Sequence, residues 1–378
     1  MYRYLTALLF ATTIFLNSFA QTTAKEWFDK GNALKAEKEY DDAITAFKKA
    51  TTLKINYPEA LHQLGWCYNE KGFYKEAVDA LKKEIIAGST DKASNDFELG
   101  YAYGQLLKYD EAISYLNKAI ELDDQFALAY KERGTVYYRS KQYSKVLDDY
   151  EKYETYITGD INDADYYYRK GWVEDDQGKY TDAVTALKKA VALDNNYADA
   201  FSELGYACFK LQLNDDALQY FRTAMALNAK DHHPVLGIAD VYFDNLKNYD
   251  SAVVYYEKGI VLQKKNKSAF YRLGWCYNDK KRYADAINPL KEAVLLDANY
   301  IEARNELGYA WYKLDKYDDA LAQFRMIMQQ SAKDQLSRYY AGFCFYLKND
   351  QDNLKKMIAE LKALNATNYV ETLTKYVK

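Results

Sequence analysis

The sequence predicts an all-α solenoid of about ten helix-turn-helix units, closed by a C-terminal capping helix. Glycines recur at intervals of 34 to 37 residues, with one double interval of 69. A series of small residues follows most of these glycines by twelve positions, and a series of tyrosines precedes the small residues by three. A fixed period of this length is typical of helical repeat proteins. The chain has only 3 prolines in 378 residues, which leaves few obligatory helix breaks.

Each repeat is defined by the glycine and small-residue series. The glycines are Gly31, Gly65, Gly100, Gly134, Gly171, Gly205, Gly274, Gly308 and Gly342, and Ala239 fills the vacant place in the long interval, which also holds one inserted residue. The small-residue series is Ala43, Ala77, Ala112, Val146, Ala183, Ala217, Ala252, Ala286, Ala320 and Leu354. Small side chains at both places allow two helices to approach closely. The tyrosine series is assigned to the scaffold: Tyr40, Tyr74, Tyr109, Tyr143, Tyr180, Tyr249, Tyr283 and Tyr317.

Helical spacing within each repeat predicts two helices. In the second repeat, Leu61, Leu64 and Tyr68 recur at the spacing of one helix face, and Ala77 and Leu81 do so in the next segment. Second helices often begin with acidic residues and end with lysines, an arrangement that suits the helix dipole. Each repeat is therefore expected to be a helical hairpin.

The motif within these hairpins resembles the tetratricopeptide repeat (TPR) family. Two units show it: one reads Phe201, Leu204, Gly205, Cys208, Asn214, Ala217, Phe221 and Ala224, and the other reads Phe270, Leu273, Gly274, Tyr277, Tyr283, Ala286, Leu290 and Ala293. The resemblance covers roughly residues 24–364 and implies a right-handed superhelical solenoid with a concave groove. The chain departs from the family pattern because the usual proline after the second helix is missing. Pro289 instead lies inside a second helix, where a slight bend is expected.

The chain divides into a leader, a solenoid and a cap. Residues 1–20 read as a secretory signal peptide, with Arg3, a twelve-residue apolar run and small residues before the cleavage site. The apolar run is too short to span a bilayer, so no stable membrane span is expected. A short segment, 21–23, precedes the solenoid at 24–365, and residues 366–378 are expected to form the capping helix. The signal peptide implies export to the periplasm or the medium, and the family's usual hosts suggest a Gram-negative bacterium.

A larger three-repeat rhythm is visible in the residue after each glycine. It reads Trp66, Tyr101, Thr135, then Trp172, Tyr206, Asp240, then Trp275, Tyr309, Phe343. One leading repeat (24–57) is therefore followed by three modules near 58–163, 164–266 and 267–365. Triplication of one module accounts for the pattern, which is also compatible with selection for a ligand that contacts every third repeat.

The resemblance places aromatic residues along the concave groove. In the family, the place after the glycine lines the groove together with the places four before it and three or four after it. The predicted partner-binding residues are Trp66, Tyr101, Tyr138, Tyr168, Trp172, Tyr206, Phe209, Phe243, Tyr271, Trp275, Tyr309, Tyr312, Tyr339, Phe343 and Tyr346. The alternative is that these rings are additional packing between neighbouring first helices. An exposed aromatic strip favours a binding surface.

The predicted function is therefore an exported scaffold whose partner is a protein or peptide. The family's carboxylate clamp needs Lys, Asn or Arg at groove places of adjacent repeats, whereas Lys131, Asn305 and Asn32 are not in adjacent repeats. Capture of a chaperone C-terminus is not expected. A glycan-binding module that stacks sugars on the same rings, or a purely structural spacer, remains an alternative.

Charge and motifs argue against other functions. The formal net charge of −4 and the mean hydropathy of −0.53 do not suit a nucleic-acid-binding protein or a multi-pass membrane protein. No cofactor, catalytic or metal-binding motif appears, so the chain is not expected to be an enzyme. His62 falls on the groove face, and His232 and His233 are expected in a loop before a helix. The four cysteines lie in non-adjacent repeats and are expected to be buried thiols.

Overall fold

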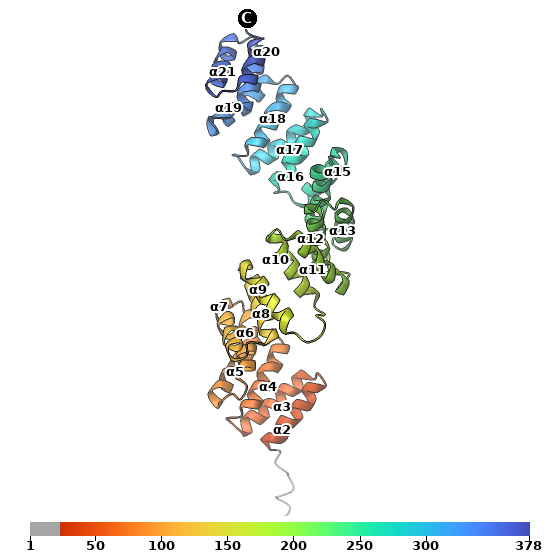
Figure 1. The fold of residues 1–378 in the computed structure, drawn as a ribbon, viewed down its shortest axis with the longest axis vertical. Coiled ribbons are helices and arrows are strands. Elements are labelled where there is room, and N and C mark those ends of the chain that lie inside the picture. Colours follow the sequence, from red (N-terminus) through yellow and green to blue (C-terminus); the bar gives the residue numbers. More distant parts are fainter. Residues whose placement is uncertain (1–22) are drawn as a thin grey trace, which may run out of the picture. The chain divides into compact units, whose positions relative to one another are not determined.

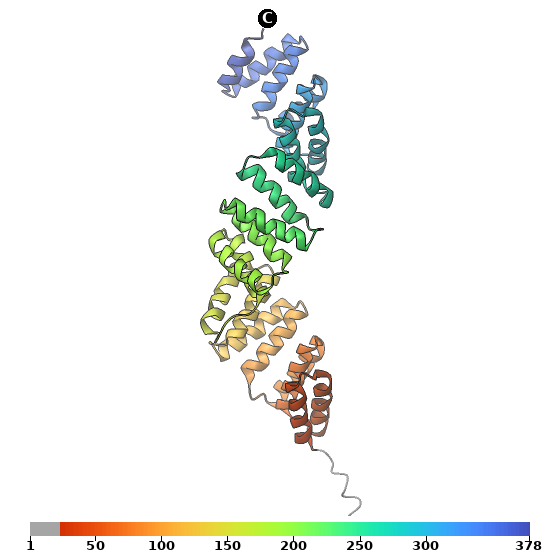
Figure 2. The ribbon, with the colours of Figure 1, turned by 90° about the vertical axis from the view of Figure 1, so that its right-hand side faces the viewer.

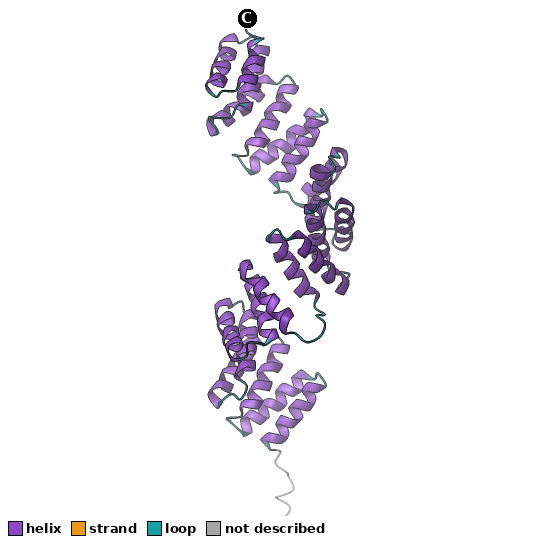
Figure 3. Cartoon of the chain, viewed as in Figure 1, coloured by secondary structure: helices purple, strands orange, loops and turns teal. Residues whose placement is uncertain are grey.

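The computed structural model describes residues 23–378, and this part of the chain is built from helices and turns, without a β-strand (Figures 1 and 3). The proposed signal peptide at residues 1–20 lies outside the described residues. Contacts divide the chain into two compact units, Met1–Ile161 and Asn162–Lys378. The described residues form 21 α-helices, and ten helical hairpins precede the last helix. The prediction of an all-α repeat solenoid with a capping helix is confirmed.

The first unit holds four hairpins. In each, a first helix packs against the second helix that follows it (Figure 2). The helices are α2 (Ala24–Ala36), α3 (Tyr40–Leu53), α4 (Pro58–Glu70), α5 (Tyr74–Ala87), α6 (Lys92–Gln105), α7 (Tyr109–Leu122), α8 (Ala127–Arg139), the 3₁₀ turn η1 (Tyr143–Lys145) and α9 (Val146–Tyr156).

The second unit holds six hairpins and the cap, with the same pairing of neighbours. Its helices are α10 (Ala164–Asp176), α11 (Tyr180–Leu193), α12 (Ala198–Lys210), α13 (Asn214–Leu227), α14 (His232–Asp240), the π-helical turn η2 (Val241–Asn245), α15 (Tyr249–Leu262), α16 (Lys267–Asp279), α17 (Tyr283–Leu296), α18 (Ile301–Lys313), α19 (Tyr317–Gln330), α20 (Leu336–Leu347), α21 (Gln351–Ala363) and α22 (Thr367–Thr374). Pro289 lies inside α17 and is buried.

The glycine series allows the two helices of a hairpin to touch. At Gly308, an added Cβ would lie 2.5 Å from Cε1 of Phe324 on the second helix, and at Gly205 it would lie 2.7 Å from Cδ1 of Phe221. Both phenylalanines are almost completely buried. At Gly342 the obstructing side chain is instead Leu373 of α22. The capping helix therefore packs on α20, the first helix of the tenth repeat.

The irregular intervals of the glycine series have structural causes. The inserted residue in the 69-residue interval is absorbed by the π-helical turn Val241–Asn245, which directly follows α14. In that repeat the glycine of the close contact lies on the second helix, where a Cβ added at Gly259 would collide with the side chain of Leu236 on the first helix. The 37-residue interval contains the connection between α9 and α10, where the two compact units divide.

The turn inside each hairpin holds one residue in the left-handed region. Glycine fills this place in two repeats, as Gly72 and Gly178, but Leu107 fills it in the third repeat with φ of +59°. Leu107 is 68% exposed, so its side chain contributes little packing.

Replacement of Leu107 by glycine is expected to stabilise the first unit. The left-handed conformation costs a non-glycine residue roughly 1–2 kcal/mol, and the flexibility of glycine in the unfolded chain offsets part of this. The net gain expected for Leu107→Gly is about 0.5–1 kcal/mol. Urea denaturation followed by circular dichroism measures it. A lower midpoint for the variant would contradict the assignment of strain to this turn.

The hairpins enclose continuous cores of Ala, Leu, Phe and Tyr side chains. The expectation that all four cysteines are buried is confirmed, and each is a free thiol. Burial raises the pKa of Cys67 and Cys208 to about 11 and that of Cys276 and Cys344 to about 12. Within residues 23–378, the apolar helices are all too short to cross a bilayer.

Candidate binding face and its polar pocket

The fifteen predicted binding residues all lie on the first helix of a repeat or on the adjoining turn η2. Three belong to the first unit and twelve to the second. None is buried in the core, and Tyr206 is 40% exposed while the others are half-buried. On each unit, we call the surface that these residues line the aromatic face. Half-exposure is compatible with ligand contact, but their role in binding stays a prediction.

Rings of the aromatic face contact the tyrosine that begins the second helix of the preceding repeat. Trp66 lies 5.7 Å from Tyr40, edge to face. The corresponding pairs are Tyr74–Tyr101 at 6.2 Å, Tyr249–Trp275 at 5.0 Å and Tyr283–Tyr309 at 6.0 Å between ring centroids. Edge-to-face contacts of this kind stabilise neighbouring elements by roughly 0.5–1.5 kcal/mol each.

These contacts revise the assignment of the tyrosine series to the scaffold alone. Tyr40, Tyr74, Tyr249 and Tyr283 belong to both the scaffold and the aromatic face, because their rings meet the residue after the next glycine. The two residues of a pair are always 26 or 27 positions apart in the sequence. That constant interval is the signal in the sequence that marks these contacts.

A second row of ring pairs joins repeats at the other end of the first helices. Phe97 contacts Phe126 at 5.1 Å, and Tyr271 contacts Tyr300 at 5.2 Å. Tyr168 contacts Tyr197 at 5.0 Å. In each pair the second ring belongs to the residue that directly precedes the next first helix. Two predicted groove rings, Tyr168 and Tyr271, are therefore used in packing between repeats, as the alternative interpretation expected.

Lysines cover some of the exposed ring faces. Nζ of Lys35 lies 3.7 Å from the ring centroid of Trp66 and donates a hydrogen bond to Oε1 of Gln63 at 2.6 Å. Burial lowers the pKa of Lys35. Nζ of Lys313 lies 5.3 Å from both Tyr309 and Tyr312. A ligand that stacked on Trp66 would first have to displace the Lys35 ammonium.

The capping helix changes the expected role of the last repeat. Tyr369 of α22 stacks on Tyr339 at 4.5 Å. Tyr376, which follows α22, contacts Phe343 at 5.4 Å and Tyr346 at 4.7 Å. These three predicted groove residues therefore support the attachment of the cap.

One hollow of the aromatic face in the second unit is lined by polar groups as well as rings. Its volume is about 330 Å³, and we call it the Asn278 pocket. It is lined by Trp275, Asn278, Asp279, Lys281, Tyr283, Asn305, Glu306, Tyr309, Leu336 and Tyr340. The first helices α16, α18 and α20 supply most of these residues. Of the predicted binding residues, Trp275 and Tyr309 are brought together here.

Hydrogen bonds fix the orientation of the buried amide in this pocket. Nδ2 of Asn278 donates to Oε2 of Glu306 at 2.8 Å and to the backbone oxygen of Glu306 at 3.0 Å. Because both partners are acceptors, the amide nitrogen must face them. Asn278 is only 6% exposed, and its Oδ1 accepts no hydrogen bond from the described residues. Oδ1 of Asn305 is likewise without a donor in the described chain.

The Asn278–Glu306 contact belongs to a recurring cross-repeat pair. The first member lies four residues after a glycine, and the second lies two residues before the next glycine. In the first unit, Nδ2 of Asn69 donates to Oε2 of Glu98 at 2.6 Å. Across the repeat that contains η2, Nη1 of Arg272 donates to Oδ2 of Asp244 at 2.6 Å. These pairs were not among the predicted site residues, although their interval of 28 or 29 residues is regular in the sequence.

The middle module carries two acids at this pair. Asp175 occupies the place of Asn69 and Asn278, and Glu203 occupies the place of Glu98 and Glu306. Burial raises the pKa of Asp175 to about 6. Burial and the neighbouring Asp175 raise the pKa of Glu203 to about 7. Oδ1 of Asp175 is buried and accepts no hydrogen bond from the described residues. Near neutral pH this pair is therefore partly protonated.

Comparison with protein-family models identifies the repeats. Two models described as tetratricopeptide repeat match residues 28–92 and 97–126, and one described as TPR repeat matches residues 176–212. A further model, described as anaphase-promoting complex, cyclosome, subunit 3, matches residues 245–327. The matched segments fall on repeat helices of both units. The chain is a tetratricopeptide repeat (TPR) protein. TPR solenoids are scaffolds for protein–protein interaction.

Individual relatives are distant. Superkiller protein 3 of Schizosaccharomyces pombe is 22% identical over 71% of this TPR chain and 18% of its own length. Human tetratricopeptide repeat protein 13 is 26% identical over 44% of this chain and 20% of its own. The chain thus spans about a fifth of these curated relatives. Among solved structures, YrrB, described as a TPR protein with an unusual peptide-binding site, is similar with a TM-score of 0.48, 22% identity, and coverage of 50% of this chain and 98% of its own.

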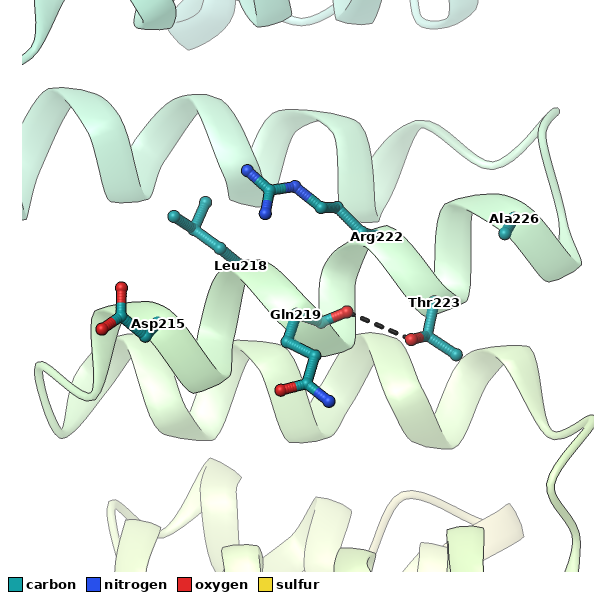
Figure 4. Close-up of a pocket in the computed structure, with 6 residues that line it drawn as sticks. All are labelled: Asp215, Leu218, Gln219, Arg222, Thr223 and Ala226. Atoms are coloured by element: carbon teal, nitrogen blue, oxygen red, sulfur yellow. Dashed lines mark hydrogen bonds between the residues drawn. The ribbon is translucent and has the colours of Figure 1, made fainter.

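Hollows also occur on the second helices of the TPR units. Figure 4 shows one that is lined by Asp215, Leu218, Gln219, Arg222, Thr223 and Ala226, all from α13. Oγ1 of Thr223 donates to the backbone oxygen of Gln219 at 3.1 Å, a bond within the same helix. No predicted groove residue lines this hollow. A single helix face with no convergent polar groups is a weaker candidate than the Asn278 pocket.

The histidines do not join the aromatic face. Nδ1 of His62, which the sequence placed on the groove face, pairs with Oε2 of Glu84 on α5 at 3.1 Å, so this ring nitrogen is engaged within the scaffold. His232 begins α14 and is not in the preceding loop as expected; Asp231 caps this helix by accepting from the backbone nitrogen of His233 at 3.0 Å. Asp231, His232 and His233 could together face a metal ion, but the Asp231 carboxylate already serves the helix cap.

Proposed function

We propose that this TPR protein is an exported scaffold that binds a protein or peptide segment on its aromatic face, and that it has no catalytic role. The observation that carries the proposal is the Asn278 pocket, where Trp275 and Tyr309 stand beside unpartnered amide oxygens. Aromatic rings provide contact area with little loss of side-chain entropy, and convergent polar groups provide specificity. Ring contacts between neighbouring repeats hold the rings in place before a ligand arrives.

The proposal favours an extended peptide over an acidic C-terminus. The carboxylate-clamp residues are not in adjacent repeats, and the Asn278 pocket presents acceptor oxygens and two carboxylates. An incoming carboxylate would meet repulsion from Asp279 and Glu306. A backbone amide or another hydrogen-bond donor would satisfy the free oxygens.

Binding to a peptide array tests the proposed function. We expect the protein to bind a subset of ten-residue peptides, and the triple variant Trp66→Ala, Trp172→Ala, Trp275→Ala to bind them at least tenfold more weakly. Loss of a central aromatic residue at an interface commonly costs 2 kcal/mol or more, roughly thirtyfold. A variant with Trp27→Ala and Trp311→Ala, which lie outside the predicted binding set, serves as the matched control. Equal binding by the triple variant and the wild type would contradict the proposal.

Glycan binding remains the second candidate, because rings beside amide and carboxylate oxygens can also hold a sugar. A polysaccharide panel examined with the same variants separates the two. Retention of peptide binding without polysaccharide binding supports the first proposal, and the reverse supports the second.

Export is the other part of the proposal, and it rests on the pattern of residues 1–20. Expression with these residues in a Gram-negative host, followed by fractionation and intact-mass measurement, tests it. The expected product is a periplasmic or secreted chain that begins at Gln21. Cytoplasmic protein that retains Met1 would contradict export.

A further inference from the structure

We propose that the Asn278 pocket binds the side chain of an arginine or lysine from the partner peptide. This inference rests on the proposed function and names the chemistry of one part of the ligand. Its evidence is the combination of unpartnered acceptors, two carboxylates and aromatic walls within one hollow of about 330 Å³.

The unpartnered atoms in the pocket all require a hydrogen-bond donor. Oδ1 of Asn278 is buried, and Glu306 fixes its orientation through two hydrogen bonds to Nδ2. Rotating the amide by 180° would place its oxygen against two acceptors and lose both bonds, so Nδ2 faces Glu306 and the free atom is the acceptor Oδ1. Oδ1 of Asn305 is also free. An unsatisfied buried acceptor costs roughly 1–3 kcal/mol, which a donor from the ligand would recover.

The charge in the pocket favours a cationic donor. Asp279 and Glu306 both line it, and Lys281 is the one basic residue in the lining. Within residues 23–378, Lys281 forms no ion pair with either carboxylate. Burial raises the pKa of Glu306, and the hydrogen bond from Asn278 opposes the rise. A cation beside Glu306 would compensate this cost of burying a carboxylate.

The aromatic walls add to the attraction. Trp275, Tyr309 and Tyr340 present rings to the same hollow, and a cation over such a ring gains about 0.5–2 kcal/mol. Liquid water occupies about 30 Å³ per molecule, so the hollow has room for a long side chain after water is displaced. Arginine offers five donors in a planar arrangement and is the better match to several separated oxygens.

The neighbouring cross-repeat pair already binds a guanidinium in this way. Nη1 of Arg272 donates to Asp240 at 2.8 Å and to Asp244 at 2.6 Å. The same guanidinium lies 5.0 Å from the ring centroid of Phe243. Arg272 lies two residues before its glycine, and Glu306 occupies the equivalent place in the next repeat. Like the site around Arg272, the Asn278 pocket thus combines acceptor oxygens with aromatic rings. It differs because no arginine of the chain lines it.

Titration with short blocked peptides tests this inference on the full-length protein. The probes are acetyl-Ala-Ala-Arg-Ala-Ala-amide and the same peptide with citrulline, which keeps the shape of arginine without its charge. Binding is followed through the indole resonance of Trp275 in NMR spectra, assigned with Trp275→Phe. We expect the arginine peptide to bind about tenfold more tightly than the citrulline peptide, as for the loss of one charge-assisted contact.

Glu306→Gln is the deciding variant, because glutamine can still accept the hydrogen bond from Asn278. It is expected to abolish the preference for arginine. Glu302→Gln, an exposed residue on the same helix, is the matched control and is expected to preserve it. Circular dichroism and hydrogen exchange establish that both variants remain folded.

The outcomes distinguish this inference from the proposed function. Equal affinity for the arginine and citrulline peptides, or an unchanged preference in Glu306→Gln, overturns the cationic pocket. If peptides from the array still shift the Trp275 resonance in that case, the proposed function survives. If no peptide of any composition shifts it, both the pocket and the peptide-binding face are contradicted.

Discussion

The Asp175→Asn variant is expected to be more stable than the wild type at pH 8. Asparagine occupies the equivalent place in the other two modules, where it donates to Glu98 or Glu306. In the wild type, the half-buried acids Asp175 and Glu203 occupy these two places, and Asp175 contributes to the raised pKa of Glu203. Their replacement by a hydrogen-bonded amide–carboxylate pair removes one buried charge and supplies a donor. The expected gain is on the order of 1–2 kcal/mol.

The raised pKa values of Asp175 and Glu203 determine how the stability of the folded wild type changes with pH. Both folded-state pKa values, about 6 for Asp175 and about 7 for Glu203, lie above the values of 3.8 and 4.5 expected for the unfolded chain. The folded state therefore binds more protons than the unfolded state. The stability contributed by this pair is fully present below about pH 4 and is lost as pH rises through about 6 and 7. The loss is on the order of 1–3 kcal/mol once solvent screening is allowed for.

Urea denaturation of the full-length protein at pH 5 and pH 8 measures the effect. The midpoint of the wild type should fall between the two pH values by more than that of Asp175→Asn. Asp176→Asn, an exposed neighbour on α10, is the control for a change in net charge. Identical pH profiles for Asp175→Asn and the wild type would show that the two acids are not coupled as described.

Gly308→Ala is expected to destabilise the ninth repeat, although alanine is the better helix former. The new Cβ would lie 2.5 Å from Cε1 and 2.8 Å from Cζ of Phe324, which is fully buried and closely packed. Overpacking of this kind costs about 1–3 kcal/mol, which outweighs a gain in helix propensity of up to about 1 kcal/mol. Hydrogen exchange of peptides from 301–330 measures the local loss, and peptides from 24–53 in the first unit provide the internal control.

A second substitution makes the cause of this effect testable. In a Phe324→Ala background, the obstructing ring is absent and the same glycine-to-alanine change is expected to cost little. The coupling between the two sites should therefore exceed about 1 kcal/mol. Equal costs of Gly308→Ala in both backgrounds would show that the contact with Phe324 is not the reason for glycine.

The architecture could be predicted from the sequence because the information is periodic. The glycine interval defined the ten hairpins, and the 69-residue gap predicted an inserted residue that the structure absorbs as the π-helical turn Val241–Asn245. Local spacing cannot show which atoms meet across two repeats. The contact of Tyr249 with Trp275 and the hydrogen bond of Asn278 to Glu306 depend on how successive hairpins stack.

The candidate site could be predicted only in part, because the periodic sequence places residues on a face but does not give their contacts. Sequence position placed Trp275 and Tyr309 on one face, but it could not show that Lys35 covers Trp66 or that Tyr369 packs on Tyr339. Both facts depend on side-chain conformation and on the position of the cap. The acidic pair of Asp175 and Glu203 stands out only once the equivalent pairs of the other modules are known.

Fluorine NMR of 5-fluorotryptophan-labelled protein tests the central claim, binding on the aromatic face, most directly. The five tryptophans provide their own controls: Trp66, Trp172 and Trp275 lie on the predicted face, whereas Trp27 and Trp311 contact lysines outside the predicted set. On addition of a peptide bound in the array, we predict that the Trp275 resonance shifts and that those of Trp27 and Trp311 remain in place. Shifts confined to Trp27 or Trp311 would contradict the aromatic face as the binding surface.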